Sequence, residues 1–148
     1  MRSLVAATTV AASHLLPYYH MALEPQTLQA TILVADDDAD VLMLVCAVLT
    51  EAQFGYLTAR NGKEAVTAFQ QASCHIDLFL SDFNMPKMNG LEAARSIRLC
   101  DPTIPVLIMS SDIGLTSPDG EWQFLEKPFS ATALLTKIND LLCVERRR

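Results

Sequence analysis

The sequence lacks an excess of positive charge and a cysteine motif for metal binding, and each absence excludes a class of protein. Its 148 residues include 11 Lys and Arg against 17 Asp and Glu, so the formal net charge is −6. This balance argues against a broad nucleic-acid-binding surface. None of the four cysteines belongs to a C-x-x-C pair, and no histidine lies at metal-ligand spacing from them. We therefore expect the cysteines to be small, mostly buried side chains in a reducing compartment.

The first thirty residues differ in character from the rest. Arg2 precedes a weakly apolar run at residues 4–16, which is similar to a poor signal peptide. The run is too short and too rich in Thr, Ser and Ala for a membrane span. A second methionine, Met21, precedes the first strong strand pattern. We interpret residues 1–30 as a disordered or wrongly started leader that the domain does not need, and residues 145–148 as a basic tail. We expect a cytoplasmic protein.

From Thr31 onward, short apolar runs alternate with stretches of helical period. We expect strands at residues 32–35, 56–59, 77–81, 106–109 and 122–125, and helices at residues 38–53, 63–72, 91–99 and after Ser130. The first helix should bury a face made of Val41, Leu44, Val45, Val48 and Ala52, and Gly55 should cap its end. Such alternation predicts one α/β domain over residues 31–144, with a parallel sheet covered by helices on both faces.

Polar side chains follow four of these strands. Asp36, Asp37 and Asp38 follow the first, Asp82 the third, Ser110 the fourth and Lys127 the fifth. The carboxyl ends of parallel strands share one edge, so these groups should converge. Two carboxylates 4 Å apart repel by about 4 kcal/mol at an effective dielectric near 20. A bound Mg²⁺ would relieve that repulsion. A carboxylate nucleophile, a metal, a cation and a hydroxyl are the parts needed to form an acyl phosphate. Asp38 is the exception, since a helix N-cap suits it better.

Four motifs resemble the receiver domain of two-component response regulators, and together they span Thr31 to about Val144. They are ILVADDD at 32–38, SDFNMPKMNG at 81–90, MSS at 109–111 and EKPF at 126–129. The second motif is the most specific, because an Asp followed by Met-Pro and then Gly at this spacing is close to diagnostic. The resemblance implies a flavodoxin-like, doubly wound sheet of five parallel strands in the order 2-1-3-4-5.

The resemblance also implies a role for each matching residue. Asp82 would accept the phosphoryl group, and Mg²⁺ would be held by Asp36, Asp37 and Asp82 and by the backbone carbonyl of Asn84. Asp37 would be the direct ligand of the acidic pair. The Ser110 hydroxyl and the Lys127 ammonium would contact the phosphoryl group, with a cis bond before Pro128. Ser110 and Phe124 would form the conformational switch, and Phe124 stands where the family often has Tyr.

Two departures from the family pattern affect the expected function. The segment between Ser110 and Trp122 is short and contains Gly114, Pro118 and Gly120, so the fourth helix should be shortened or missing. We also expect no effector domain after the last helix. We therefore expect a single-domain, chemotaxis-regulator-like protein. It would take its phosphoryl group from a histidine kinase or phosphotransfer protein and signal to an unknown downstream protein, without contacting nucleic acid or membrane. It would be no enzyme beyond its own phosphorylation and dephosphorylation.

Two alternatives remain open. A haloacid-dehalogenase-like phosphatase would use Asp36 and Asp38 as its acid pair, with Ser110 and Lys127 in later motifs. That class needs an insertion after the first strand and a late acidic pair, and it would leave Asp82 unexplained. The second alternative is a receiver-like interaction module that is not phosphorylated. Such modules usually lose an acid or the lysine, whereas this chain keeps them.

Overall fold

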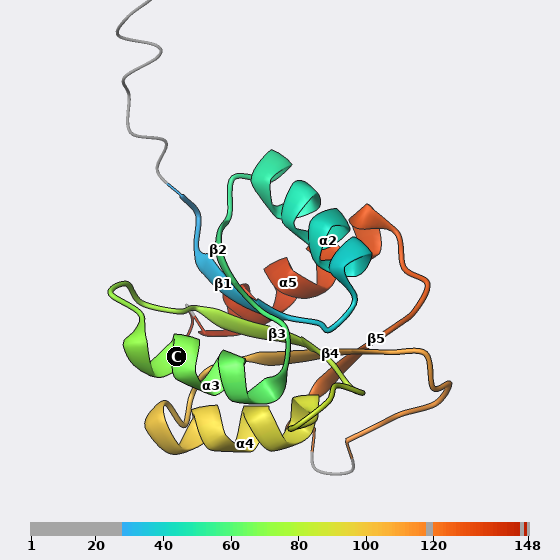
Figure 1. The fold of residues 1–148 in the computed structure, drawn as a ribbon. Helices are drawn as coiled ribbons and strands as arrows, with labels where there is room; N and C mark the ends of the chain where they lie inside the picture. Colours follow the sequence, from blue (N-terminus) through green and yellow to red (C-terminus); the bar gives the residue numbers. More distant parts are fainter. Residues whose placement is uncertain (1–27, 118–119, 146, 148) are drawn as a thin grey trace, which may run out of the picture.

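The computed structural model describes residues 28–117, 120–145 and 147 (Figure 1). The strands are β1 (Thr31–Ala35), β2 (Gly55–Ala59), β3 (Leu78–Asp82), β4 (Val106–Ser110) and β5 (Gln123–Glu126). The helices are α2 (Ala39–Glu51), α3 (Gly62–Gln71), α4 (Gly90–Cys100) and α5 (Ala131–Glu145). Each strand and helix expected from the sequence is present, with ends that differ by a few residues.

All strand pairs of the sheet are parallel, and the order is β2-β1-β3-β4-β5. Figure 1 shows α2 and α5 on one face of the sheet and α3 and α4 on the other. This is the flavodoxin-like arrangement that the sequence predicts. Because the chain steps outward from β1 to β2 and then returns to β3, the strand order reverses beside β1, where such sheets place their sites.

Strands β1, β3 and β4 are apolar on both faces because helices cover both sides of them. Alternate residues of β1 enter different cores: Ile32 and Val34 face α2 and α5, whereas Leu33 and Ala35 face α3 and α4. We name the second layer the α3/α4 core, made chiefly of Leu33, Phe79, Ala94, Ile97, Ile104, Val106, Ile108 and Trp122. The edge strand β2 instead alternates between half-buried and exposed residues, as a strand covered on one side would.

Polar side chains cap the helix starts. Asp38 accepts hydrogen bonds from the backbone N–H groups of Asp40 and Val41, which confirms its expected capping role. Asn89 and Glu92 form a capping box at the start of α4. The expected cap at Gly55 is wrong: Gly55 opens β2, and Gln53 takes the left-handed conformation with φ 62°. Leu44 was wrongly placed in the buried face, since it is exposed and Leu42, Val45 and Leu49 are buried.

The connection between β4 and β5 is the unusual crossover. Its described residues, 111–117 and 120–122, form bends and turns without a helix, as the sequence predicts for this segment. The fourth helix that the structure describes is α5, which is full length. Strand β5 nevertheless keeps its register, with Leu107 opposite Gln123. Trp122, just before β5, is buried in the α3/α4 core.

Other expectations have mixed outcomes. The leader assigned to residues 1–30 falls almost entirely outside the described residues, so it stays a prediction, as does most of the basic tail. Within the described part of the chain, no helix combines the length and apolarity needed to cross a membrane. The expectation of mostly buried cysteines is wrong: all four are free, Cys46 is half-buried, and the other three are exposed. They lie on outward-facing helix positions and in a loop, where an apolar sequence context does not imply burial.

Candidate phosphoacceptor site

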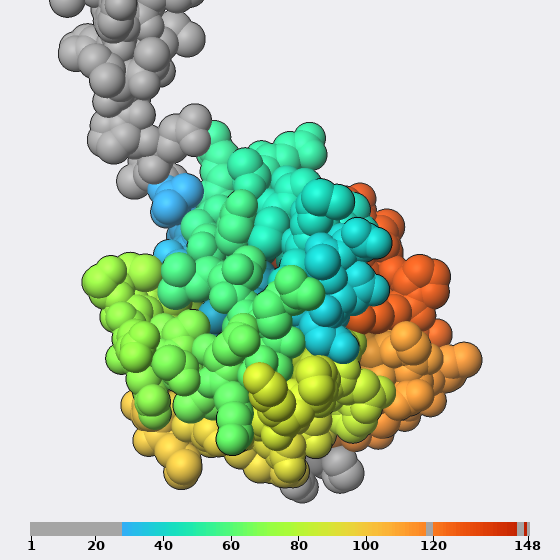
Figure 2. Space-filling model, viewed as in Figure 1, coloured from blue at the N-terminus to red at the C-terminus, as the bar shows by residue number. Residues whose placement is uncertain are grey.

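Four strands deliver one polar residue each to the same edge of the sheet. Asp36 directly follows β1, Asp82 ends β3, Ser110 ends β4, and Lys127 directly follows β5. The three residues from the inner strands are almost fully buried, with exposed fractions of 1% for Asp36, 8% for Asp82 and 2% for Ser110. In Figure 2 the segments that follow β1 (cyan), β3 (yellow-green) and β4 (orange) adjoin one another at the surface. The convergence expected from strand ends is therefore present.

Lys127 joins the two buried acids. Its Nζ lies 2.7 Å from Asp82 Oδ1 and 3.0 Å from Asp36 Oδ2, and it donates a hydrogen bond to each. The backbone N–H of Lys127 also donates to the Ser110 carbonyl at 2.7 Å. The peptide bond between Lys127 and Pro128 is cis, as the resemblance implied. One residue thus links the carboxyl ends of β1, β3 and β4, and its ammonium points at the carboxylate expected to be phosphorylated.

A third acid completes a candidate metal site. One carboxylate oxygen from each of Asp36, Asp37 and Asp82 lies within 4.8 Å of the others, and Asp37 is exposed. Three carboxylates facing one ammonium leave two negative charges in excess. Hard carboxylate oxygens with one side open to water suit Mg²⁺, which keeps several waters when bound to protein. The donor set therefore fits the magnesium ion that the sequence predicts.

Burial and pairing act in opposite directions on the ionisable groups. Burial raises the pKa of Asp36, although the Asp38 N–H and Lys127 partly offset this effect by stabilising the carboxylate. Burial alone would lower the pKa of Lys127, but hydrogen bonds and charge attraction from Asp82 and Asp36 outweigh it, so the pKa of Lys127 is raised. Lys127 is therefore held as a cation, whereas Asp36 carries a charge that its surroundings do not fully compensate.

The Ser110 hydroxyl has a local partner. Its oxygen accepts a hydrogen bond from the Asp112 backbone N–H at 3.0 Å. Because the oxygen only accepts in this bond, the O–H group remains available to donate to a group on Asp82. Phe124, the other expected switch residue, is half-buried and packs against the α3/α4 core. Ser110 and Phe124 line the same cavity of about 190 Å³.

Close backbone contacts hold the loop behind Asp82. The N–H of Gly90 donates to the Phe83 carbonyl at 3.0 Å, and the N–H of Phe83 donates to the Met109 carbonyl at 2.8 Å. The Gly62 N–H at the start of α3 donates to the Met88 carbonyl at 3.1 Å. A Cβ on Gly62 would come within 2.4 Å of that carbonyl. The loop between β3 and α4 is therefore fixed near both of its ends, directly after Asp82.

Sequence reasoning missed Arg60. It follows the last residue of β2, and its Nη2 donates to the Asp37 carbonyl at 3.2 Å, so it steadies the backbone of an expected metal ligand. The same strand-end argument that selected Lys127 would have found it. Asn84 lies in the exposed loop two residues after Asp82. The role of its carbonyl as a ligand stays a prediction.

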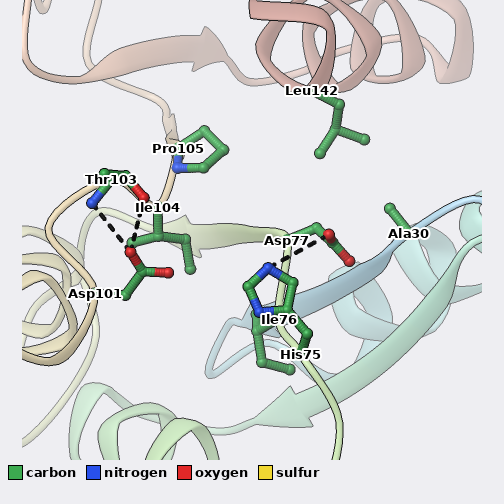
Figure 3. Close-up of a pocket in the computed structure, with 9 residues that line it drawn as sticks. All are labelled: Ala30, His75, Ile76, Asp77, Asp101, Thr103, Ile104, Pro105 and Leu142. Atoms are coloured by element: carbon green, nitrogen blue, oxygen red, sulfur yellow. Dashed lines mark hydrogen bonds and ion pairs between the residues drawn. The ribbon is translucent and has the colours of Figure 1, made fainter. Parts of the chain in front are cut away.

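A second hollow, of about 200 Å³, lies at the opposite edge of the sheet (Figure 3). Its acidic groups have local partners. Asp77 accepts a hydrogen bond from the Thr31 N–H and lies 3.6 Å from His75 Nε2. Asp101 accepts from both the N–H and the hydroxyl of Thr103. These bonds explain the acids as ties between strand starts and loops, so they do not indicate a ligand.

Comparison with known proteins matches this geometry to one family. The family model described as the response regulator receiver domain matches residues 32–139, which include each of the strand-end residues described above. The chain belongs to that family. The resemblance to the receiver domain that the motifs indicated is thereby confirmed.

Particular relatives add detail. The chain is 30% identical over 118 residues to the transcriptional regulatory protein GlrR of Escherichia coli, covering 76% of this chain and 26% of GlrR. It is 34% identical over 108 residues to the sensor kinase/phosphatase LuxN of Vibrio campbellii, covering 70% of this chain and 12% of LuxN. The match thus spans only 26% and 12% of the length of these two curated relatives.

Two solved structures match over nearly their whole length. The chemotaxis protein CheY4 of Vibrio cholerae is 30% identical, with a TM-score of 0.67, and the match covers 76% of this chain and 98% of CheY4. A response regulator receiver protein of Sinorhizobium medicae is 32% identical, with a TM-score of 0.69, covering 78% of this chain and 97% of that one.

Proposed function

We propose that this receiver domain accepts a phosphoryl group on Asp82 from a phosphohistidine of a sensor kinase or phosphotransfer protein. The observation that carries the proposal is the Lys127 ammonium, 2.7 Å from Asp82 Oδ1 within a cluster of three carboxylates. A lysine that formed only a structural ion pair with one buried carboxylate would need no further acids beside it. Here a third acid, Asp37, adds negative charge beside the two carboxylates that Lys127 already contacts, as expected of a site for a phosphoryl group and a divalent cation.

Each residue has a defined part in this transfer. A carboxylate oxygen of Asp82 attacks the phosphorus; the new O–P bond forms as the N–P bond of the donor breaks, and the imidazole keeps the electron pair and takes up a proton. Mg²⁺ held by Asp36, Asp37, Asp82 and the Asn84 carbonyl would neutralise charge on the phosphoryl oxygens. Lys127 pairs with one phosphoryl oxygen. The Ser110 hydroxyl, whose oxygen accepts from the Asp112 N–H, donates its proton to another.

The chemistry is stoichiometric, because one acyl phosphate forms per chain and its hydrolysis by water restores Asp82. We therefore propose a signalling role rather than that of an enzyme with turnover on a free substrate. Switching of Ser110 and Phe124 would signal to a protein partner in the cytoplasm, where free cysteines stay reduced. Whether the domain acts alone, as the sequence analysis expected, stays a prediction.

The phosphatase alternative is disfavoured by one specific contact. Its acid would be Asp38, but that side chain caps α2 by accepting from Asp40 and Val41. Helix α2 also begins at Ala39, which leaves no insertion after β1.

The test is labelling with acetyl phosphate and Mg²⁺, followed by intact-protein mass spectrometry. We expect one phosphoryl group on the wild-type chain and none on Asp82→Asn. Asp140→Asn, an exposed aspartate of α5, is the matched control and should label normally. Labelling that persists in Asp82→Asn would contradict the assignment of the acceptor. A wild-type chain that never labels would favour the interaction module, and steady turnover of a phosphate ester would favour the phosphatase.

A further inference from the structure

Arg98 of α4 binds the residues that precede β5. Its Nη2 donates to the Glu121 carbonyl at 2.9 Å, and its Nη1 lies 3.3 Å from Glu121 Oε1. Its guanidinium lies 4.2 Å from the centroid of the Trp122 ring, a distance at which a cation and an aromatic face attract each other. Its Nε donates to the Ile104 carbonyl at 3.4 Å. We name Arg98, Glu121 and Trp122 the Arg98 clamp.

The clamp lies where the crossover helix is missing. Within the described part of the segment, Gly120 and Glu121 otherwise donate hydrogen bonds only to Ser117, which belongs to the same segment. The Arg98 side chain is 21% exposed, so most of it is packed within the structure. A planar guanidinium can donate to two carbonyls and stack on a ring at once, which a lysine cannot do. The clamp therefore ties α4, the loop before β4 and the start of β5 together.

The clamp leads to the candidate switch along β5. Trp122 directly precedes β5 and Phe124 lies within it two residues later, and both pack into or against the α3/α4 core. Phe124 lines the cavity that Ser110 also lines. A displacement of the turn after Ser110 therefore reaches Phe124. Trp122, two residues earlier in the chain, is held in place by Arg98.

We propose that Arg98 is a positioning residue for the switch, which does for β5 what a crossover helix would otherwise do. The inference rests on the proposed function. When the Ser110 side chain turns to donate to the phosphoryl group, the turn that its oxygen holds through the Asp112 N–H shifts with it. The clamp holds residues 121 and 122, so β5 does not shift to accommodate that movement. The movement instead changes the packing of Phe124 and Trp122. Among the described contacts of Arg98, none is with Asp36, Asp37, Asp82 or Lys127, so phosphoryl transfer itself does not depend on it.

The experiment compares Arg98→Met with Arg95→Met in the full chain. Arg95 lies on the same helix with an exposed side chain, so it is a matched control. Labelling of Asp82 by acetyl phosphate should stay within about twofold of wild type in both variants. Trp122 is the only tryptophan, so intrinsic fluorescence reports on the clamp directly. Adding beryllium fluoride with Mg²⁺ should change this emission in wild type and Arg95→Met, and leave it unchanged in Arg98→Met.

Hydrogen exchange in the unphosphorylated protein tests the clamp without the phosphoryl chemistry. Amides of residues 121–126 should exchange at least about tenfold faster in Arg98→Met, since their opening costs less, while β1 and β3 keep wild-type rates. Arg98→Lys keeps the charge but loses the planar guanidinium and its several N–H donors, so it should give intermediate values by both methods. It also replaces Arg98→Met in the experiment if that variant does not fold.

The outcomes separate the two proposals. A wild-type chain that does not label overturns the proposed function and with it the signalling part of this inference, while exchange still decides the anchoring part. A wild-type chain that labels without any change in tryptophan emission overturns the coupling. Wild-type exchange rates and a full emission change in Arg98→Met overturn the clamp.

Discussion

A Cβ atom on Gly90 would lie 2.2 Å from the carbonyl oxygen of Asp82. That oxygen is backbone, so it cannot rotate away as a flexible side chain would. The chain therefore folds back directly behind Asp82, and α4 begins in contact with it. The glycine in the motif of residues 81–90 is explained by this approach of two backbone segments.

Gly90→Ala should lower the free energy of unfolding by about 1–3 kcal/mol, because inserting a methyl group here must displace backbone. It should also slow labelling of Asp82, whose carbonyl is the displaced group. Gly55→Ala is the control, since its nearest neighbour is the end of the Leu28 side chain. Urea unfolding measures both variants. Equal destabilisation by the two would argue against the steric explanation.

Asp36 should make the free energy of unfolding of the metal-free protein fall as pH rises. Burial raises its pKa above the ordinary 3.8, so the folded state holds the proton more tightly than the unfolded chain. This contribution to stability is present below the ordinary value and lost as pH rises through the folded pKa. Asp36→Asn cannot titrate, so its stability relative to wild type should rise with pH across that window. Urea unfolding in chelator from about pH 3 to 7 measures this difference; a constant difference would contradict it.

Lys127 should make the stability of the folded protein depend on pH in the alkaline range. Its pKa is raised above the ordinary 10.5 by Asp82 and Asp36. The stabilisation is therefore complete below that ordinary value and is lost as pH rises through the folded pKa. Lys127→Met should be less stable at neutral pH by about 1–3 kcal/mol, allowing for partial exposure, because two acids lose their cation. Lys137→Met on α5 is the control. The gap between Lys127→Met and wild type should narrow as the wild type deprotonates, and a gap independent of pH would count against the ion pairs.

Ser110→Ala should separate the switch from the acceptor. The hydroxyl is expected to donate to the phosphoryl group, and a hydrogen bond to a charged partner contributes about 1.5–3 kcal/mol. Labelling should therefore slow by about 10- to 100-fold without being abolished. Ser111→Ala, at the neighbouring exposed serine, should label at the normal rate. If Ser110→Ala labels as fast as wild type, the hydroxyl does not reach the phosphoryl group.

Phosphorylation should not produce a dimer through the face over β5. The described residues between β4 and β5 form no helix, so the helix that would build this face with β5 and α5 is not there to contribute contacts. Light scattering of the phosphorylated and unphosphorylated chain should give the same mass. A phosphorylation-dependent dimer that Phe124→Ala disrupts would overturn this expectation.

The strands and the site could be predicted because both depend on short-range patterns. Runs such as Ile32–Ala35 are apolar on both faces, and polar residues directly after them must lie at one edge of a parallel sheet. Helix α2 was harder, because Met43 and Leu44 are apolar yet exposed. A helix with apolar residues on most of its sides gives no unique buried face from periodicity. Leu44 was misplaced for this reason.

Contacts between distant elements could not be predicted in the same way. Arg98 looked like an ordinary charged residue near a helix end, and only the fold brings it to Trp122. Gln53 was missed because its left-handed conformation is determined by the return of the chain to β2, whereas Gly55 offered the more familiar signal. The cysteines of α4 and α5 show the same limit, since exposure of a helix position depends on which neighbouring elements cover it.

Lys127 contacts Asp36 across 91 positions of the chain and Asp82 across 45. Closing loops of this length costs entropy, which contacts elsewhere in the domain must offset. The acceptor, the acids and the lysine can therefore come together only after β1, β3 and β5 have all joined the sheet. A nascent chain that has not yet added β5 would hold its acids without their cation. Competence to receive a phosphoryl group would then report that synthesis and folding of this domain are complete.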